Sequence, residues 1–266
     1  MMNVIRADIY RLTRNAGVHI NIIVNALSIA IMIPIFYIFG NNDGDVAFSA
    51  ITVAYQLLEI SAVAVIAVIP IFIAVAFPIF RDGAVKNEVI WGTSRTTLYI
   101  VRLLLTAVLC IIIRITFVGA GMIVATIVAG FGYAPDGFWL TFLQVFSAQT
   151  FMFIAASWLG VFLTFTIKEG ATISITFISL MMAPSMIIQF LGFFNVNPSA
   201  IYFLLNIDMM TIIAYIPTLG DPYNTVGLLG ADQLDGGILR ALAVGAFWMI
   251  VPTVIGIMKF QRAEIK

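Results

Sequence analysis

Charged residues are scarce in this sequence. Only 10% of its 266 residues are Asp, Glu, Lys or Arg, whereas 62% are apolar. Soluble domains carry about 25% charged and about 45–50% apolar residues. The shortage of charge therefore excludes an ordinary soluble domain and indicates an integral membrane protein. The net charge is zero, which by itself points to no class of partner, and we expect no nucleic-acid partner.

Cysteine and histidine are almost absent. Cys110 is the only cysteine, so no intramolecular disulfide can form, and its place within an apolar run is typical of a small buried hydrophobe. No residues have the spacing of metal ligands, and no nucleophile is paired with a base by spacing. We therefore expect neither a metal site nor catalysis in this chain. His19, the single histidine, is interpreted as a hydrogen-bonding group at the membrane boundary rather than a proton relay.

Long linkers and low-complexity segments are also lacking, so we predict one membrane domain over 1–266. A bilayer core about 30 Å thick requires roughly 20 apolar residues in a helix. We predict six transmembrane helices, at 18–39, 49–79, 97–130, 139–167, 171–194 and 238–259. The second and third exceed the required length, so we expect them to tilt, to bend at Pro70 and Pro78, or to project from the membrane.

Positive charge is distributed unequally between the loops. With six spans, nearly all Lys and Arg residues fall on one side, and by the positive-inside rule both termini are cytoplasmic. A further apolar stretch, 200–216, contains Asn206 and Asp208. If it crossed the membrane, the basic C-terminal tail would lie outside. We therefore predict that residues 198–217 form extracellular half-helices that re-enter the outer leaflet without crossing it.

The segment before the first span has helical periodicity. In 3–17 the apolar residues Ile5, Ile9, Leu12 and Ala16 share one face, and charged residues surround the rest. This pattern predicts an amphipathic helix lying on the inner leaflet. The alternative is a solvated start to the first span.

A second cytoplasmic segment joins the second and third spans. Apolar residues over 84–91 indicate a short amphipathic helix, Gly92 is placed to end it, and Ser94 is placed to cap the next helix. Such an elbow would be a rigid lever attached to two spans. On local physics alone, a solvated loop is equally consistent with the residues.

Three motifs resemble those of one transporter family. The pattern in the elbow comprises Lys86, Asn87, Ile90, Gly92, Ser94, Arg95, Tyr99 and Arg102. It resembles the cytoplasmic loop of ABC-2-type ABC transporter permeases. The N-terminal ADIYRLTRN resembles their amphipathic helix, and the C-terminal KFQRAEIK resembles their closing motif. Arg102 replaces a common lysine and Glu264 a common aspartate, and both keep the charge. The three motifs together contain about 35 residues, while the predicted topology of the whole chain also resembles that of the family. Within the family, the small size is most similar to that of bacteriocin-immunity and peptide-export permeases.

The resemblance implies that residues 81–96 form a coupling helix seated on a separate ATPase subunit. The residues assigned to this contact are Arg81, Lys86, Asn87, Glu88, Trp91, Gly92, Ser94 and Arg95. The chain lacks a G-x-x-x-x-G-K loop, so ATP and Mg²⁺ would bind the ATPase and not this chain. A second permease chain, identical or homologous, and a bacterial plasma membrane are also implied.

Two charges fall deep within predicted spans. Burying Glu59 or Arg114 alone near mid-membrane costs about 2.5–3.5 kcal/mol, so we predict that they pair. A direct role in substrate passage is the alternative. Thr52, Tyr55, Gln56 and Glu59 form a polar stripe that either lines an outward vestibule or joins helices. A narrow face on the third span is suited to close helix packing; it consists of Ala107, Cys110, Arg114, Gly121 and Ala125.

The sequence therefore predicts an all-α permease subunit of an ABC exporter, without enzyme activity of its own, that expels hydrophobic or amphipathic substrates such as antimicrobial or toxin-like peptides. Two alternatives belong to other classes. One is a secondary transporter that uses Glu59 and Arg114 as an ion or proton relay. The other is a membrane sensor or assembly subunit that transports nothing.

Overall fold

The computed structural model describes residues 2–40, 49–60, 66, 68–81, 92–134, 136–167, 169–193, 209, 212–213 and 237–262. Over these residues the chain is all-α and contains no strand. The helices are α1 (Met2–Thr13), α2 (Ala16–Gly40), α3 (Ala50–Ile60), α4 (Val68–Arg81), α6 (Arg95–Ala129), α7 (Phe138–Ile167), α8 (Gly170–Phe193) and α11 (Gly237–Arg262).

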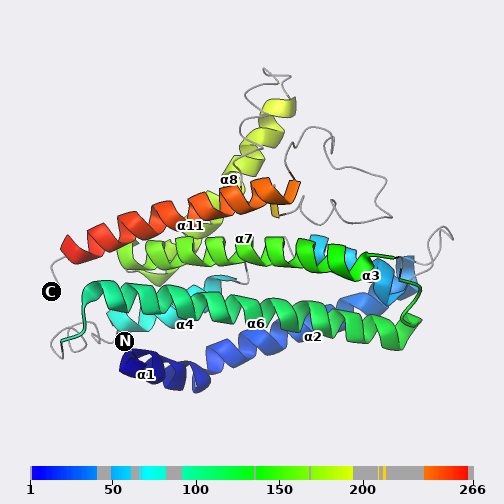
Figure 1. The fold of residues 1–266 in the computed structure, drawn as a ribbon, viewed down its shortest axis with the longest axis horizontal. Helices are drawn as coiled ribbons and strands as arrows, with labels where there is room; N and C mark the ends of the chain where they lie inside the picture. Colours follow the sequence, from blue (N-terminus) through cyan, green and yellow to red (C-terminus); the bar gives the residue numbers. More distant parts are fainter. Residues whose placement is uncertain are drawn as a thin grey trace.

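The helices form an elongated bundle (Figure 1). The long helices α6 and α7 run antiparallel through its middle, α2 lies along α6, and α11 lies along α7. Helix α7 also packs against α4 and α8. Its apolar residues are therefore buried on several sides, which makes α7 the core of the bundle.

Four helices are long and apolar enough to cross a membrane: Ala16–Ile38, Arg95–Ala129, Phe138–Ile167 and Ile238–Arg262. They coincide with the first, third, fourth and sixth predicted spans. Their outer faces expose large apolar side chains, for example Ile23, Leu27 and Ile31 on α2. Such faces are costly in water and suit the lipid environment. The described helices thus indicate a multi-pass membrane protein.

The second and fifth predicted spans are not among these four long helices. The range of the second contains two helices, α3 and α4, and residues 61–65 and 67 lie outside the described residues. Pro70 occupies the first turn of α4, where its missing N–H breaks no helical hydrogen bond, so the expected bend of a helix at Pro70 is not found. The fifth range is the helix α8.

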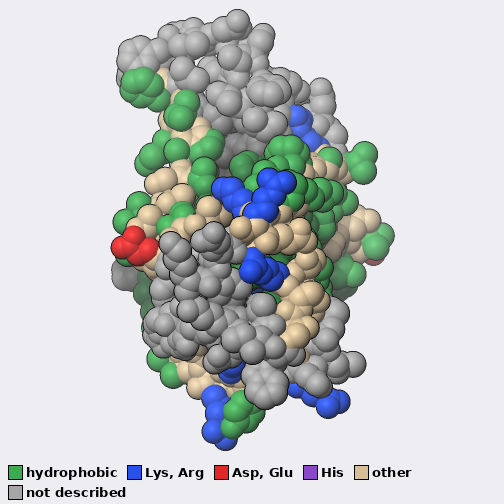
Figure 2. All heavy atoms as spheres, turned by 90° about the vertical axis from the view of Figure 1, so that its left-hand side faces the viewer, with side chains coloured by type: hydrophobic (Ala, Val, Ile, Leu, Met, Phe, Trp, Pro, Cys, Tyr) green, Lys and Arg blue, Asp and Glu red, His purple; other side chains and the backbone are tan. Residues whose placement is uncertain are grey.

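Basic side chains are concentrated at one end of the bundle. Helix α1, the start of α6 and the end of α11 lie at one end (Figure 1), and Lys and Arg side chains gather on that face (Figure 2). At the far end, the turn between α6 and α7 carries Asp136. The rings of Phe131 and Trp139 stack nearby, with centroids 6.1 Å apart, as aromatic residues do at a membrane boundary.

Candidate functional site

Helix α6 begins with the cap that the sequence predicts. Ser94 has extended backbone angles, and its side chain accepts a hydrogen bond from the Thr97 N–H at 3.1 Å, which satisfies a donor that the first turn would otherwise leave free. Gly92 has φ +84°, a value that favours glycine. The predicted Ser94 cap is confirmed, whereas the predicted helix that Gly92 would end stays a prediction. Of the predicted elbow, residues 82–91 and the side chain of Arg81 lie outside the described residues.

Arg95 caps the end of another helix. Its Nη1 donates to the carbonyl oxygens of Phe260 at 3.2 Å and Gln261 at 3.0 Å, while Gln261 Nε2 donates to Thr96 Oγ1 at 2.9 Å. The last carbonyls of a helix lack intrahelical partners and attract cations. Arg95 therefore joins the first turn of α6 to the C-terminal turn of α11. Arg95 belongs to the predicted elbow, but no pattern in the sequence predicts this bond.

Two turns further along α6, Arg102 is completely buried and forms an ion pair with Asp8 of α1. Asp8 is only 4% exposed, and its second carboxylate oxygen lies 3.5 Å from Arg11. A guanidinium removed from water requires a partner to compensate its lost hydration. The carboxylate of Asp8 supplies that compensation and fastens α1 to α6.

This pair changes one part of the predicted amphipathic helix. Asp8, expected among the charged residues around the apolar face, is 4% exposed and points into the bundle, whereas Ile9 is 48% exposed, as expected of a residue on the face toward the leaflet. The helix also ends at Thr13 and does not continue to 17, because a new helix begins at Ala16. At this joint His19 Nε2 hydrogen-bonds the Thr13 carbonyl oxygen at 2.7 Å, in agreement with the role predicted for His19. The ion pair with buried Arg102 accounts for the burial of Asp8.

Between these two arginines, Tyr99 packs into the bundle. Its ring meets Phe165 of α7 edge-on, with centroids 4.9 Å apart, and Phe165 meets Phe260 of α11 at 4.8 Å. The first two turns of α6 thus contact α1, α7 and α11 through four side chains. We call this group the inner junction; it consists of Arg95, Thr96, Tyr99 and Arg102.

Gly256 of α11 allows the inner junction to close. A Cβ at this position would overlap the Tyr99 hydroxyl and ring. We expect Gly256→Ala to lower the free energy of unfolding by about 1–3 kcal/mol through overpacking. Thermal unfolding in detergent measures the effect, and Gly119→Ala, in α6 with open space around it, is the control. Equal melting temperatures for the two variants would contradict the close contact.

A second buried polar group lies midway along α6. Arg114 is 2% exposed, its Nη2 donates to Gln149 Oε1, and its guanidinium carbon lies 4.5 Å from the ring centroid of Phe153. Gln149 Nε2 in turn donates to the carbonyl oxygens of Leu58 at 2.8 Å and Ile213 at 3.0 Å. We call Arg114 and Gln149 the central polar pair. Gln149 joins α7 to α6, to the last turn of α3 and to the segment containing Ile213.

The sequence predicts a different partner for Arg114. The side chain of Glu59 lies outside the described residues, so the predicted Glu59–Arg114 pair stays a prediction. Gln149 was not predicted as a partner. Its signal is an amide near the middle of the apolar run Phe138–Ile167, where a polar group requires a hydrogen bond.

The predicted polar stripe on α3 is only partly described. Thr52 serves the helix start: its Oγ1 accepts from the Ser49 N–H at 2.9 Å, and its N–H donates to Ser49 Oγ at 3.3 Å. Gln56 is exposed, and the side chains of Tyr55 and Glu59 lie outside the described residues. A role for this stripe in a pathway stays a prediction.

The narrow face predicted on α6 is confirmed as a packing face. Four of its five members are buried and Ala107 is half-buried, and Gly121 lies directly against Leu57 of α3. Of the predicted re-entrant segment, the structure describes only Met209, Ile212 and Ile213, which are buried in the core; the predicted half-helices otherwise fall outside the described residues.

No family model matches this chain, and no curated protein matches it. The inner junction and the central polar pair therefore carry the functional inferences.

Proposed function

We propose that this chain is the membrane-spanning permease subunit of an ATP-driven ABC exporter in a bacterial plasma membrane. It expels hydrophobic or amphipathic molecules, such as antimicrobial or toxin-like peptides, while a separate subunit binds Mg²⁺ and ATP and hydrolyses the nucleotide. The inner junction is the observation that supports this proposal most. A separate ATPase subunit must act on the permease at a place where one displacement moves several helices. The inner junction is such a place, because its contacts join the four helices α1, α6, α7 and α11.

The proposed transmission begins at residues 81–96, which dock on the ATPase. Gly92 and the Ser94 cap set the direction in which α6 leaves this segment. From there, the hydrogen bonds of Arg95 carry motion to α11, and the ion pair of Arg102 carries it to α1. In the elbow predicted from the sequence, the lever acts on the second and third spans. The contacts of α6 support a wider transmission.

The rest of the proposal concerns topology and assembly. We place six spans in the membrane with both termini cytoplasmic, because the Lys and Arg side chains gather at the end that holds α1 and the end of α11 (Figure 2). A basic end of this kind lies inside by the positive-inside rule. Two permease chains would enclose the pathway, and the exposed apolar faces of the helices suit contact with lipid or with the second chain.

Gly92→Val tests the lever. We expect this variant to retain its ATPase partner but to lose substrate-stimulated ATP hydrolysis, because a β-branched residue at φ +84° is strained and changes the elbow angle. Gly130→Val is the matched control: Gly130 has φ +82° and, like Gly92, has open space around it, but it lies at the opposite end of α6. The tagged permease is purified from native membranes and reconstituted in lipid, and the retained ATPase and its turnover are measured.

Several outcomes of this experiment would contradict the proposal. One is a permease that purifies from native membranes without any ATPase. Another is equal stimulated turnover in Gly92→Val, Gly130→Val and the unaltered protein. Lys86→Glu is a separate arm that should reduce ATPase retention, because it changes the docking surface and leaves the inner junction intact.

A further inference from the structure

The outer side of α1 is basic. In this helix and the turn that follows it, Arg6, Arg11 and Arg14 are exposed. Asp8 is the only acidic residue of the helix, and it is buried against Arg102. The carboxylate of α1 therefore compensates a charge inside the bundle, and the outer side of the helix has a surplus of positive charge.

Two of these arginines share a face with exposed apolar residues. Arg6, Tyr10 and Arg14 recur every four residues, so they lie along one side of the helix, and Ile9 lies beside them. Ile9 is 48% and Tyr10 is 58% exposed, and the Arg14 guanidinium carbon lies 4.7 Å from the centroid of the Tyr10 ring. Within the described part of the chain, neither Arg6 nor Arg14 has a carboxylate partner. We call these four residues the basic face of α1.

The basic face lies next to the lipid-facing surface of the first span. Only two residues separate the end of α1 at Thr13 from the start of α2 at Ala16, and α2 exposes Ile20 and Ile23 one and two turns further on. Basic side chains lie at the lower edge of the face in Figure 2, at the height that α1 has in Figure 1. Arginines immediately beside the cytoplasmic end of a span attract anionic headgroups.

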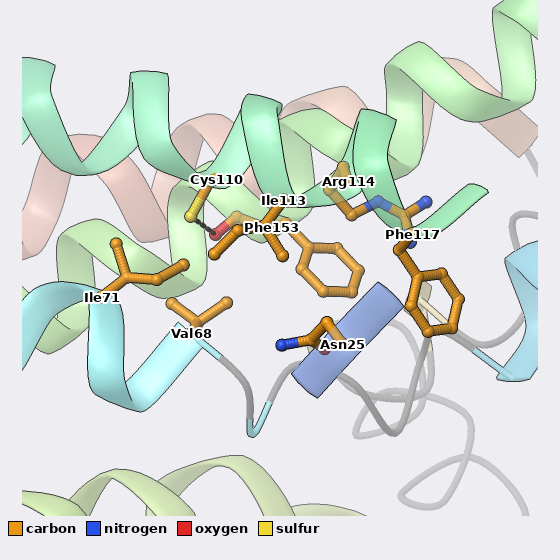
Figure 3. A pocket seen from close by; sticks show the side chains of 8 residues that line it. All are labelled: Asn25, Val68, Ile71, Cys110, Ile113, Arg114, Phe117 and Phe153. Atoms are coloured by element: carbon orange, nitrogen blue, oxygen red, sulfur yellow. Dashed lines mark hydrogen bonds between the residues drawn. The ribbon is translucent and has the colours of Figure 1, made fainter. Parts of the chain in front are cut away.

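The buried arginines cannot have this role. Arg114 lies inside the bundle beside Phe117 and Phe153 (Figure 3), and Arg102 is completely buried. A phosphate outside the bundle can therefore reach the arginines of α1 but not these two.

The apolar members of the basic face favour a lipid over an acidic protein surface or a soluble anion. A phospholipid presents a phosphate that a guanidinium binds well, and next to it an apolar boundary in which exposed Ile9 and Tyr10 are stabilised. A soluble anion would leave both of these side chains in water.

We infer that the basic face of α1 binds an anionic phospholipid of the inner leaflet, with Arg6 and Arg14 on its headgroup phosphate and with Ile9 and Tyr10 against its acyl chains. The bound lipid would hold α1, which the Asp8–Arg102 ion pair fastens to the inner junction. The inference names the lipid class that this helix recognises. It rests on the proposed placement of the basic end at the inner leaflet, but not on the ABC assignment.

Hydrogen exchange measures this binding at α1 itself. The full-length protein, without ATPase, is placed in nanodiscs of phosphatidylcholine alone or mixed with phosphatidylglycerol that has the same acyl chains. We expect exchange over Met2–Thr13 to be slower by about fivefold or more in the anionic nanodiscs, the factor expected for one arginine beside an anionic surface. Exchange over Phe138–Ile167, a helix without charged residues, should be the same in both. Glycerol 3-phosphate added to phosphatidylcholine nanodiscs should not slow exchange, because it lacks acyl chains.

Variants assign the effect to the basic face. Arg6→Gln and Arg14→Gln should each remove most of the protection by phosphatidylglycerol, whereas Arg14→Lys should retain it, because lysine keeps the charge. Arg240→Gln is the matched control: it also removes one positive charge, but from the first turn of α11, whose last turn lies at the basic end. It should leave the protection of α1 unchanged.

Four results would overturn the inference. Equal exchange of α1 in the two nanodiscs would show that headgroup charge is not recognised, and protection that persists in both Gln variants would place the lipid elsewhere. Protection by glycerol 3-phosphate equal to that by phosphatidylglycerol would indicate a site for a soluble anion. Protection that requires the ATPase and no anionic lipid would make the basic face a protein interface. That last result would leave the ABC assignment intact, whereas a permease that purifies without any ATPase would leave the lipid inference intact.

Discussion

Replacing Asp8 with Asn should lower the free energy of unfolding by about 3–5 kcal/mol, because it removes the carboxylate that compensates a buried guanidinium. Arg102 is completely buried, so water cannot replace the lost charge. The variant should therefore melt at a markedly lower temperature in detergent, and α1 should become sensitive to protease, since the ion pair fastens it to α6. Thermal unfolding and limited proteolysis measure the two effects.

Arg11→Gln is the matched control for Asp8. Arg11 also lies within 3.5 Å of Asp8, but its side chain is largely exposed, and exposed ion pairs contribute only about 0–1 kcal/mol. The double variant Asp8→Asn, Arg102→Met should recover much of the stability, because it removes the uncompensated charge together with its partner. If Asp8→Asn is as mild as Arg11→Gln, the pair does not anchor α1.

Replacing Gln149 with Leu should also be severe. The two side chains have similar volumes, so the change removes hydrogen bonds and leaves little cavity. It deprives Arg114 Nη2 of its acceptor and the carbonyl oxygens of Leu58 and Ile213 of one donor. The guanidinium and the Ile213 carbonyl each lose a partner at about 1–3 kcal/mol, so we expect a loss of at least about 2 kcal/mol.

Gln144→Leu is the control on the same helix, since Gln144 is exposed on α7. We expect Gln144→Leu to change the free energy of unfolding by no more than about 0.5 kcal/mol, as ordinary surface substitutions do. Its melting temperature should change correspondingly little. Thermal unfolding in detergent compares the two variants. Similar melting temperatures for Gln149→Leu and Gln144→Leu would show that the central polar pair does not hold α3 and α7 together.

Local features of the fold could be predicted from the sequence, since their signals lie within a few residues. The Ser94 cap depends on its spacing to Thr97, the positive φ of Gly92 depends on residue type, and the packing face of α6 depends on helical periodicity. The four long spans follow from the length of their apolar runs.

The partners of the buried arginines could not be predicted in the same way. Arg102 and Asp8 are far apart in the chain. Asp8 is the only acidic residue of α1, but the sequence does not show that α1 lies beside the second turn of α6. Arg95 and Gln149 use backbone carbonyl oxygens, which every residue carries, so side-chain identity gives no signal for them. The structure was required because these bonds depend on which helix ends meet in space.

The position of Arg114 along α6 has a mechanical consequence. About 28 Å of helix separates Arg114 from Arg95, and about 24 Å separates it from Gly130. The central polar pair thus lies near the midpoint of α6 and could act as the pivot of a rigid rod with two arms of nearly equal length. If α6 tilts as a rigid rod by about 10° around that pivot, its two ends move by about 4–5 Å in opposite directions. Closure at one face of the membrane and opening at the other would then be a single motion of one rod, with the smallest displacement at Arg114.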